Sequence, residues 1–540
     1  MNTASPPRFA VIGPERAELG LDDGAVLVAD IYRPSGGHHP VLLMRQPYGR
    51  AIASTVVFAH PAWYAARGYI VVVQDVRGCG DSGGDYQAFV NEAADGVRTL
   101  DWAAELPYSS GRIGLYGFSY QAVTQYLALA GGGRRPDALA PAMGGWSLRD
   151  DWAYEGGAFR IQNNVGWAVQ MAKLKAARAG DLEAHAALSG PCGHDRLREL
   201  LVARPDLSHL AAWLADDPSY WARIAPSQLL ADDPLDIPVL HTGGWNDFLL
   251  GGTLAADAAF RAKSPQTAHL VVGPWAHLPW NRSAGTADMG AAAEFSVDRA
   301  QLAFFDFYLK GQGERPPSAQ MFDMGRRRWL TLPHRPAAAS TSFFLASSGL
   351  AAALVSDGRL AREPGEPGED LFVHDPTRPA PMVGGALGTP NGFADPRAAD
   401  DRADVAVYTT PPFEKTVLLA GEAKAAIQVA TAEPGFDLSA RLSLVHPQGG
   451  AFVLATGYAR SHAGGSQEIA IALNATCATV PAGCALRLSL QGGGWPAFDI
   501  HPASGMGAAP VTLQISHGAM RPSRIDLPIL SEETPDADAV

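Results

Sequence analysis

The sequence predicts an α/β fold with a helical insertion and a β-rich C-terminal domain, and three observations indicate it. Strand and helix patterns alternate over residues 20–148 and again over 236–315, as in a mostly parallel sheet with helical connections. Between them, residues 149–235 are rich in Ala, Leu and charged residues with helical spacing. After residue 318 the composition shifts to short alternating β runs broken by Gly and Pro.

These patterns divide the chain into five segments. Residues 1–148 and 236–318 are predicted to form two parts of one α/β domain, and residues 149–235 a helical cap between them. Residues 319–530 are predicted to form a β-sandwich, and residues 531–540 an acidic tail. The chain has 540 residues, 47% of them hydrophobic. It is therefore too long for one ordinary core, and it has enough apolar side chains to fill more than one.

Ser119 lies where a buried strand is expected to turn sharply into a helix. Residues 112–117 have the apolar and glycine content of a short strand, and residues 120–130 carry apolar residues at helical spacing. This arrangement is typical of a nucleophile elbow, in which small neighbours such as Gly117 and Ala122 relieve crowding. Gln121 departs from the G-x-S-x-G pattern at its second glycine. The alternative is a serine in an ordinary turn or at a helix N-cap.

Asp247 and His277 each follow an apolar run that is typical of a strand, residues 237–242 and 268–273. Both are therefore expected just past strand carboxyl ends, where α/β sheets place their sites. Alone, each would more often be a turn, cap or surface residue. The chain order Ser, Asp, His is that of the α/β-hydrolase fold, so the three together predict a catalytic triad.

Several further motifs give the chain a family resemblance. It resembles the cocaine esterase and X-prolyl dipeptidyl peptidase group of serine hydrolases, whose elbow reads G-x-S-Y-x-G; Ala122 replaces the last glycine here. The other matching motifs are Arg-Gln-Pro-Tyr at 45–48, the Gly-rich run at 75–84, Gly-Gly-Trp-x-Asp at 243–247, Gly-Pro-Trp-x-His at 273–277, and two C-terminal signatures at 374–381 and 495–502.

The resemblance implies an oxyanion hole and a C-terminal topology. By resemblance, the hydroxyl of Tyr48 and the backbone amide of Tyr120 hold the oxyanion, and the C-terminal β-sandwich is a jelly roll. Fixed donors of this kind stabilise charge that develops only in the transition state. Without the family, Tyr48 would more readily be interpreted as a packing aromatic.

The run from Gly78 to Gly83 spells G-x-G-x-x-G after an apolar strand and therefore has to be weighed as a nucleotide site. Four residues separate the strand from the first glycine, and a helical pattern begins only near Glu92. A tight loop beside the active site is the favoured interpretation, and no cofactor is expected.

Composition excludes some partners and leaves other questions open. The net charge of −13 argues against nucleic acid or an anionic membrane as partner. No leader-like amino terminus and no run of 18 apolar residues is present, so a soluble cytoplasmic protein is expected.

The four scattered cysteines are expected to be free thiols, although Cys477 and Cys484 could pair across a hairpin. No metal site is expected, and the oligomeric state stays open.

Acidic and aromatic residues just beyond the elbow helix suggest a substrate pocket. Trp146, Trp152 and Phe248 are candidates to line it. Asp150, Asp151 and Glu155 could hold a substrate ammonium group. The alternative is that these are helix-start acids and core tryptophans.

Taken together, the sequence predicts a serine hydrolase that cleaves a carboxylic ester of a small organic molecule through an acyl-enzyme. The alternative within the family is an amide or peptide bond hydrolase: an acylase, an α-amino-acid ester hydrolase or an X-prolyl dipeptidyl peptidase. Two rivals from other classes are a nucleotide-dependent oxidoreductase using the Gly78 loop and a catalytically inactive binding protein.

Overall fold

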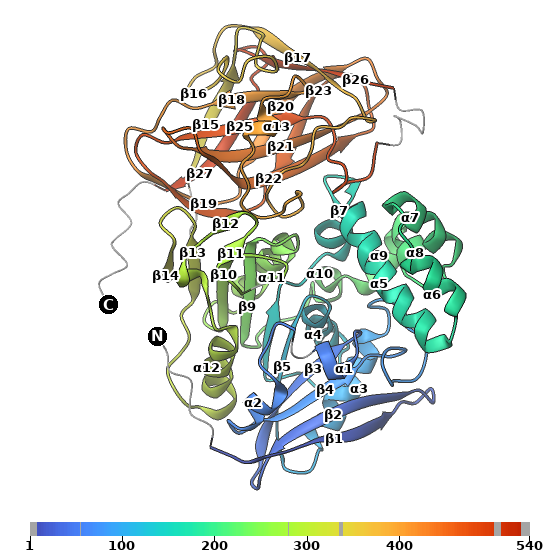
Figure 1. The fold of residues 1–540 in the computed structure, drawn as a ribbon. Helices are drawn as coiled ribbons and strands as arrows, with labels where there is room; N and C mark the ends of the chain where they lie inside the picture. Colours follow the sequence, from blue (N-terminus) through green and yellow to red (C-terminus); the bar gives the residue numbers. More distant parts are fainter. Residues whose placement is uncertain (1–7, 54–55, 279, 334–338, 502–508, 531–540) are drawn as a thin grey trace.

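The computed structural model describes residues 8–53, 56–278, 280–333, 339–501 and 509–530, and the predicted acidic tail lies outside them. A sheet flanked by helices, a group of cap helices and a β-rich C-terminal domain meet around one central region (Figure 1). No helix in these ranges is long and apolar enough to cross a lipid bilayer.

The first sheet has ten strands, and its central seven are parallel. From edge to edge, the order is β1-β2-β4-β3-β5-β6-β9-β10-β13-β14; pairing is parallel from β4 to β13 and antiparallel at both edges. The strands are β1 (Val11–Gly20), β2 (Val26–Pro34), β3 (His39–Gln46), β4 (Ile70–Asp75), β5 (Ser109–Phe118), β6 (Ala138–Ala142), β9 (Val239–Asn246), β10 (Ala268–Ala276), β13 (Ala319–Asp323) and β14 (Arg328–Leu332).

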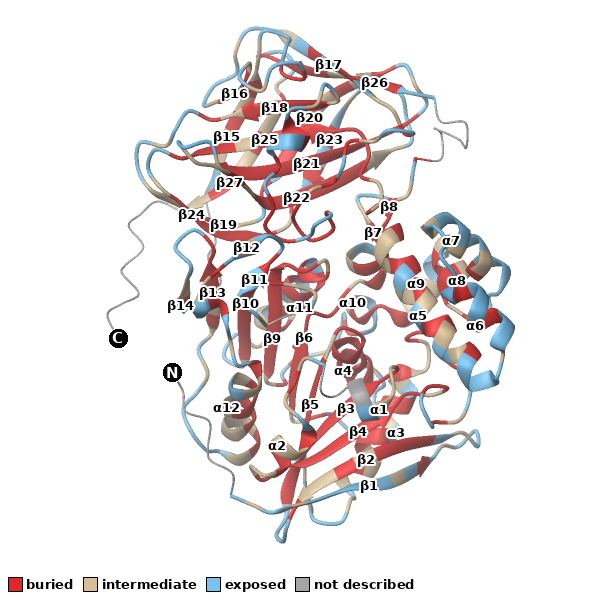
Figure 2. Cartoon of the chain, in the orientation of Figure 1, coloured by how far each residue is buried: buried red, intermediate tan, exposed pale blue. Residues whose placement is uncertain are grey.

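Helices cover both faces of this sheet, so its central strands are buried throughout (Figure 2). On one face, Leu43 and Leu115 pack with α3 (Glu92–Ala104), α4 (Tyr120–Ala130) and α11 (Leu250–Lys263). On the other face, Leu42 and Tyr116 pack with α2 (Pro61–Ala65) and α12 (Val297–Lys310). The short helix α1 (Arg50–Ala53) follows β3. The alternation of neighbouring residues between the two faces is the two-residue period of a strand.

The insertion predicted as a helical cap carries six helices, preceded by a π-helix and a hairpin. The π-helix spans Leu148–Ala153, and the hairpin consists of β7 (Tyr154–Glu155) and β8 (Ala158–Phe159). The helices are α5 (Ile161–Ala179), α6 (Leu182–Ser189), α7 (His194–Ala203), α8 (Leu210–Ala215), α9 (Pro218–Ile224) and α10 (Pro226–Leu229). The sequence pattern did not predict the hairpin, whose paired stretches are two residues each.

The C-terminal domain is β-rich, as predicted. Its thirteen strands in the described ranges join into one hydrogen-bonded set. They are β15 (Ala339–Ala346), β16 (Gly358–Ala361), β17 (Gly368–His374), β18 (Val405–Thr409), β19 (Val417–Gly421), β20 (Lys424–Thr431), β21 (Phe436–Val445), β22 (Ala451–Ser461), β23 (Gly465–Ala472), β24 (Thr476–Val480), β25 (Ala485–Gln491), β26 (Val511–His517) and β27 (Arg524–Leu530), with one short helix, α13 (Arg397–Asp400). The jelly-roll topology stays a prediction.

The predicted boundary at residue 318 comes too early. Strands β13 and β14, over 319–332, complete the first sheet, because β13 pairs in parallel with β10. Asp323 at the end of β13 then ties this edge to the C-terminal domain by accepting hydrogen bonds from the Thr479 amide and hydroxyl. A short β run has the same residue pattern in either sheet, so composition alone could not show that these two strands belong to the first sheet.

Candidate active site

Ser119 lies at a sharp turn between β5 and α4 with an unfavourable backbone conformation. Its φ is 59° and its ψ is −119°, a region that costs free energy for a residue with a Cβ. The surrounding fold holds it there: the Ser119 amide donates to the Ala142 carbonyl of the neighbouring strand at 2.9 Å. The side chain is thereby presented at the carboxyl edge of the sheet, as expected for a nucleophile elbow.

Gln121 stands where the G-x-S-x-G motif has its second glycine, and Gly117 makes room for this larger residue. A Cβ on Gly117 would lie 2.4 Å from the Gln121 Cβ, so glycine is required opposite the larger residue. The Gln121 side chain also accepts a hydrogen bond of 3.0 Å from the Phe118 amide, which braces the turn from within. Ala122 fills the position of the family's last glycine with its Cβ 2.7 Å from where a Cβ on Gly144 would be. Small residues are therefore needed at 117 and 144.

The structure brings Ser119, His277 and Asp247 into one hydrogen-bonded chain. His277 Nε2 lies 3.1 Å from Ser119 Oγ, and His277 Nδ1 lies 2.7 Å from Asp247 Oδ1. They follow β5, β10 and β9, and the carboxyl ends of parallel strands meet at one edge of the sheet. This geometry allows His277 to take the serine proton while Asp247 fixes the imidazole tautomer.

Two aromatic rings pack against the imidazole of His277. The rings of Phe118 and Phe248 lie 4.8 and 4.6 Å from the His277 ring, centroid to centroid. Ser119 is 6% exposed and Asp247 is fully buried, whereas the His277 side chain is 25% exposed. Low local polarity strengthens the hydrogen bonds of the chain.

Tyr48 follows β3 at the same edge and is packed against the aromatic cluster that contains Tyr120, Trp152 and Trp167. Its amide donates to Gln46 Oε1 at 2.7 Å, which fixes the local turn. Burial raises the pKa of the Tyr48 hydroxyl. The hydroxyl therefore keeps its proton at neutral pH and is available as a hydrogen-bond donor.

Tyr120 contributes its backbone and its side chain in different ways. Its hydroxyl donates to Glu92 Oε1 at 2.8 Å and accepts from the Phe89 amide at 3.1 Å, so the ring anchors the elbow. As the first residue of α4, Tyr120 has an amide that lacks an intrahelical acceptor. That amide lies at the N-terminal end of α4, where the free backbone N–H groups and the helix dipole favour an anionic group.

A buried ion pair beneath the elbow was not predicted from the sequence. Arg45 and Glu92, both almost fully buried, are joined at 2.8 Å, and Arg45 Nε donates to Gln74 at 2.9 Å. Glu92 also receives the Tyr120 hydroxyl, so the pair links β3, α3 and α4. A single glutamate at a helix start carries no signal of such a role.

The three residues predicted for the substrate pocket lie in two different places. Phe248 touches His277 and lies 6.3 Å from Trp152, ring to ring. Trp146 instead packs edge-on against Tyr126 and Phe260 in the core beside the sheet, and it is 7% exposed. Trp146 is therefore a core residue, which was the alternative interpretation, and the pocket prediction is wrong for it.

The acids predicted as an ammonium site are already engaged. Asp150 pairs with Arg149 at 2.7 Å and Glu155 with Arg160 at 2.8 Å. Asp151 Oδ2 accepts from the amides of Trp146 and Ser147 at 2.8 and 2.6 Å. Burial raises the pKa of Asp151 to about 7. Each of the three therefore already has at least one partner, although Asp151 Oδ1 is buried without a hydrogen bond in the described residues.

The Gly78 loop is built around a carboxylate, which disfavours a nucleotide phosphate. A Cβ on Gly80 would lie 2.1 Å from Asp75 Oδ2, and the Asp81 amide donates to the same oxygen at 3.2 Å. Arg50 Nη1 neutralises Asp75 at 2.7 Å. The next helix, α3, begins only at Glu92. The loop therefore lacks the helix N-terminus that a dinucleotide site requires.

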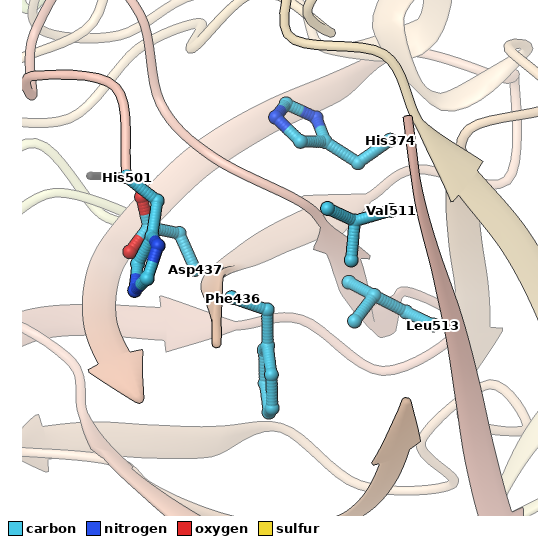
Figure 3. A pocket seen from close by; sticks show the side chains of 6 residues that line it. All are labelled: His374, Phe436, Asp437, His501, Val511 and Leu513. Atoms are coloured by element: carbon cyan, nitrogen blue, oxygen red, sulfur yellow. The ribbon is translucent and has the colours of Figure 1, made fainter. Parts of the chain in front are cut away.

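Three other features predicted or weighed as sites can be checked in the described residues. The described ranges hold no group of three or more His, Cys, Asp or Glu side chains that could ligate a metal ion. All four cysteines are free, including Cys477 and Cys484. A cavity in the C-terminal domain has a volume of about 10 Å³, enough for one water (Figure 3). It is lined by His374, Phe436, Asp437, His501, Val511 and Leu513.

Comparison with known proteins gives consistent matches over nearly the whole chain. Residues 23–279 match the family model of the X-Pro dipeptidyl-peptidase (S15 family), and residues 311–526 that of the X-Pro dipeptidyl-peptidase C-terminal non-catalytic domain. The cocaine esterase of Rhodococcus sp. (strain MB1 Bresler) is 30% identical over 561 aligned positions, which cover 94% of this chain and 97% of that protein.

Two solved structures show the same fold at lower identity. An aminopeptidase from a marine sediment Thaumarchaeota archaeon superposes with a TM-score of 0.78 at 22% identity, covering 98% of this chain and 99% of its own. An α-amino acid ester hydrolase superposes with a TM-score of 0.75 at 22% identity, covering 98% of each chain. At these identities, the likeness extends to the fold alone.

Proposed function

Because the chain belongs to the X-Pro dipeptidyl-peptidase (S15) family and is a serine hydrolase, we propose that it cleaves a carboxylic ester of a small organic molecule through an acyl-enzyme. The observation that carries the proposal is the hydrogen-bonded chain from Ser119 through His277 to Asp247. A serine hydroxyl becomes a competent nucleophile when a histidine accepts its proton and a carboxylate orients that histidine.

In the acylation step, Ser119 Oγ attacks the ester carbonyl carbon while its proton passes to His277 Nε2. The carbonyl oxygen becomes an oxyanion, for which the Tyr48 hydroxyl and the Tyr120 amide are the proposed donors. Collapse of the tetrahedral intermediate expels the alcohol, which leaves with the proton held by His277. Asp247 stays ionised and stabilises the imidazolium formed on the way.

In the deacylation step, water takes the place of the alcohol. His277 removes a proton from water as it attacks the acyl carbon, and the same donors hold the second oxyanion. Ser119 leaves with the proton from His277, so the carboxylic acid is released and the enzyme is regenerated. Phe248 and Trp152 are the proposed wall for the acyl group, since Phe248 contacts the His277 ring.

The preference for an ester over an amide rests on two points. The relative that is 30% identical is an esterase by name. A hydrolase of aminoacyl substrates needs a group for the free ammonium, and the three acids suggested for it already bind Arg149, Arg160 and backbone amides. Amide and peptide hydrolysis is the alternative outcome of the test.

The test is a hydrolysis screen of aryl esters, alkyl esters, aminoacyl esters and aminoacyl amides, with Ser119→Ala as the blank. We expect turnover of simple esters and none of aminoacyl amides above the blank. Faster cleavage of aminoacyl amides than of esters would replace the proposed activity by the peptidase alternative. Ester turnover that is unchanged in Ser119→Ala would overturn the proposed nucleophile.

A further inference from the structure

A buried arginine of the cap holds the chain segment that carries Asp247 and Phe248. Arg160 precedes α5 and is 5% exposed. Its Nη1 donates to the Phe248 carbonyl at 3.0 Å and to the Asp151 carbonyl at 2.8 Å. On the other edge of the guanidinium, Nε and Nη2 donate to Glu155 Oε2 at 3.2 and 2.8 Å. The planar fork thus joins three segments at once.

The segment it holds is next to the reacting groups. Phe248 directly follows Asp247, and its ring lies against His277. A shift of the Phe248 carbonyl would move both the carboxylate that orients His277 and the ring that packs on it. Small displacements of this kind are costly, because misplacing a reacting group by about 1 Å can lower a rate by about 100-fold.

Arg160 is itself fixed by the C-terminal domain, through the β7–β8 hairpin that precedes it. The Phe159 amide donates to Asp499 Oδ1 at 3.1 Å, and the Asp499 amide donates to the Phe159 carbonyl at 3.0 Å. At the tip of the hairpin, the Gly156 carbonyl accepts from the Arg460 amide at 2.8 Å. A Cβ on Gly156 would come 1.9 Å from the Tyr458 carbonyl, so the contact requires glycine.

On the C-terminal side, the anchor is a buried charge network. Arg460 binds Asp437 through two nitrogens at 2.7 and 2.9 Å and Asp499 at 2.9 Å. The Arg460 and Asp437 side chains are each 4% exposed. Charges removed from water in this way need their partners, so the network resists distortion. Phe248 also packs against an apolar cluster that joins Ala158 of the hairpin to side chains of the C-terminal domain such as Met382 and Phe498.

We propose that Arg160 is a positioning residue, through which the β-rich C-terminal domain and the cap together hold the Asp247–Phe248 segment in register with His277. The inference rests on the proposed function, because it assigns Asp247 its role in orienting the base. It gives the C-terminal domain a part in catalysis although that domain contributes no group to the reacting chain. The link runs from Arg460 and Asp499 through the hairpin to Arg160 and the Phe248 carbonyl.

The test uses the full-length protein with Arg160→Met, Arg160→Lys and a matched control. In Arg160→Met, both carbonyl contacts and the pair with Glu155 are lost. Arg160→Lys keeps the charge beside Glu155 but replaces the fork by one ammonium group. The control is Arg441→Met, which removes a buried ion pair of 2.7 Å with Asp400 inside the C-terminal domain. All are assayed for kcat, KM, the pH dependence of kcat/KM, and thermal unfolding.

We expect Arg160→Met to lower kcat by about tenfold with little change in KM, and Arg160→Lys to fall between it and the wild type. The acidic limb of the pH profile should move to lower pH, because a less well placed Asp247 stabilises the protonated imidazole less. The position of this limb does not change when the folded fraction falls equally at every pH, and Arg441→Met checks that condition. It therefore separates positioning from general destabilisation, and Arg441→Met should lose stability but keep the wild-type profile.

Asp247→Asn separates the two hypotheses. If Asp247→Asn keeps wild-type kcat, the proposed acid is wrong, and the inference fails with it. If Asp247→Asn is inactive while both Arg160 variants keep the wild-type kcat and pH profile, the proposed function stands and the inference alone is overturned. A profile that also moves in Arg441→Met would show a general effect of destabilisation and would equally overturn it.

Discussion

Asp247 binds His277 through one oxygen only: Oδ1 lies 2.7 Å from His277 Nδ1, while Oδ2 is buried without a hydrogen-bond donor in the described part of the chain. A buried carboxylate oxygen without a donor costs free energy, so the single hydrogen bond to His277 matters more for holding this carboxylate in place. The hydrogen bond holds His277 Nδ1 against Asp247, so Nε2 is the ring nitrogen that faces Ser119.

The first prediction concerns this chain of three residues. Ser119→Ala and His277→Ala should each lower kcat for ester hydrolysis by several orders of magnitude and abolish covalent labelling by a fluorophosphonate, because the members act as a unit. Circular dichroism and thermal unfolding should stay near wild type. Labelling of Ser119→Ala at an undiminished rate would place the reactive serine elsewhere in the chain.

The second prediction concerns the oxyanion donor. Tyr48→Phe removes a hydroxyl and leaves the ring to pack, so kcat should fall by about 10²- to 10³-fold with little change in KM. Fluorophosphonate labelling should slow but persist, since Ser119 and His277 remain paired. Steady-state kinetics with one aryl ester measure both constants. A variant with nearly wild-type kcat would reduce Tyr48 to a packing residue and shift attention to backbone amides near Gly49.

The sequence predicts the fold well where a local strand pattern also determines where the next residue lies in the folded protein. Ser119, Asp247 and His277 each follow an apolar strand, and the parallel order of the sheet brings strand ends together. The prediction failed where the same sequence pattern is compatible with two places in the fold. The short β runs of β13 and β14 were assigned to the C-terminal domain, and Trp146 was assigned to the substrate pocket. Arg160 was missed because its partners are mostly backbone carbonyls, which sequence does not reveal.

The third prediction links Asp151 to the pH dependence of stability. Burial raises the pKa of this carboxyl from 3.8 to about 7, because the charged form is poorly solvated. The native state therefore holds this proton more tightly than the unfolded chain does. The stability that it contributes is fully present below about pH 4, is lost as the pH rises to about 7, and amounts to at most a few kcal/mol.

Asp151→Asn should flatten this part of the profile, because the amide cannot ionise. Urea unfolding of both proteins at several pH values between 4 and 8 measures the difference, and the wild type should weaken relative to the variant as the pH rises. As a control, Asp150→Asn changes the exposed carboxylate that directly precedes Asp151 and should leave the slope unchanged. Parallel profiles for wild type and Asp151→Asn would show that Asp151 ionises normally in the folded protein.

The last prediction separates the two aromatic residues that the sequence grouped together. Phe248→Leu shortens the side chain that lies between His277 and Trp152, and leaves the carbonyl that Arg160 binds in place. If Phe248 forms the acyl wall, kcat/KM for a benzoyl ester should fall by about tenfold, while an acetyl ester of the same alcohol should change less.

Trp146→Phe, in contrast, opens space in the core against Tyr126 and Phe260. It should lower the free energy of unfolding by about 1–2 kcal/mol and leave the ratio of the two esters unchanged. Equal losses for both esters in Phe248→Leu would mean that the ring shields His277 from water instead of selecting the acyl group. A changed ester ratio in Trp146→Phe would return that residue to the pocket.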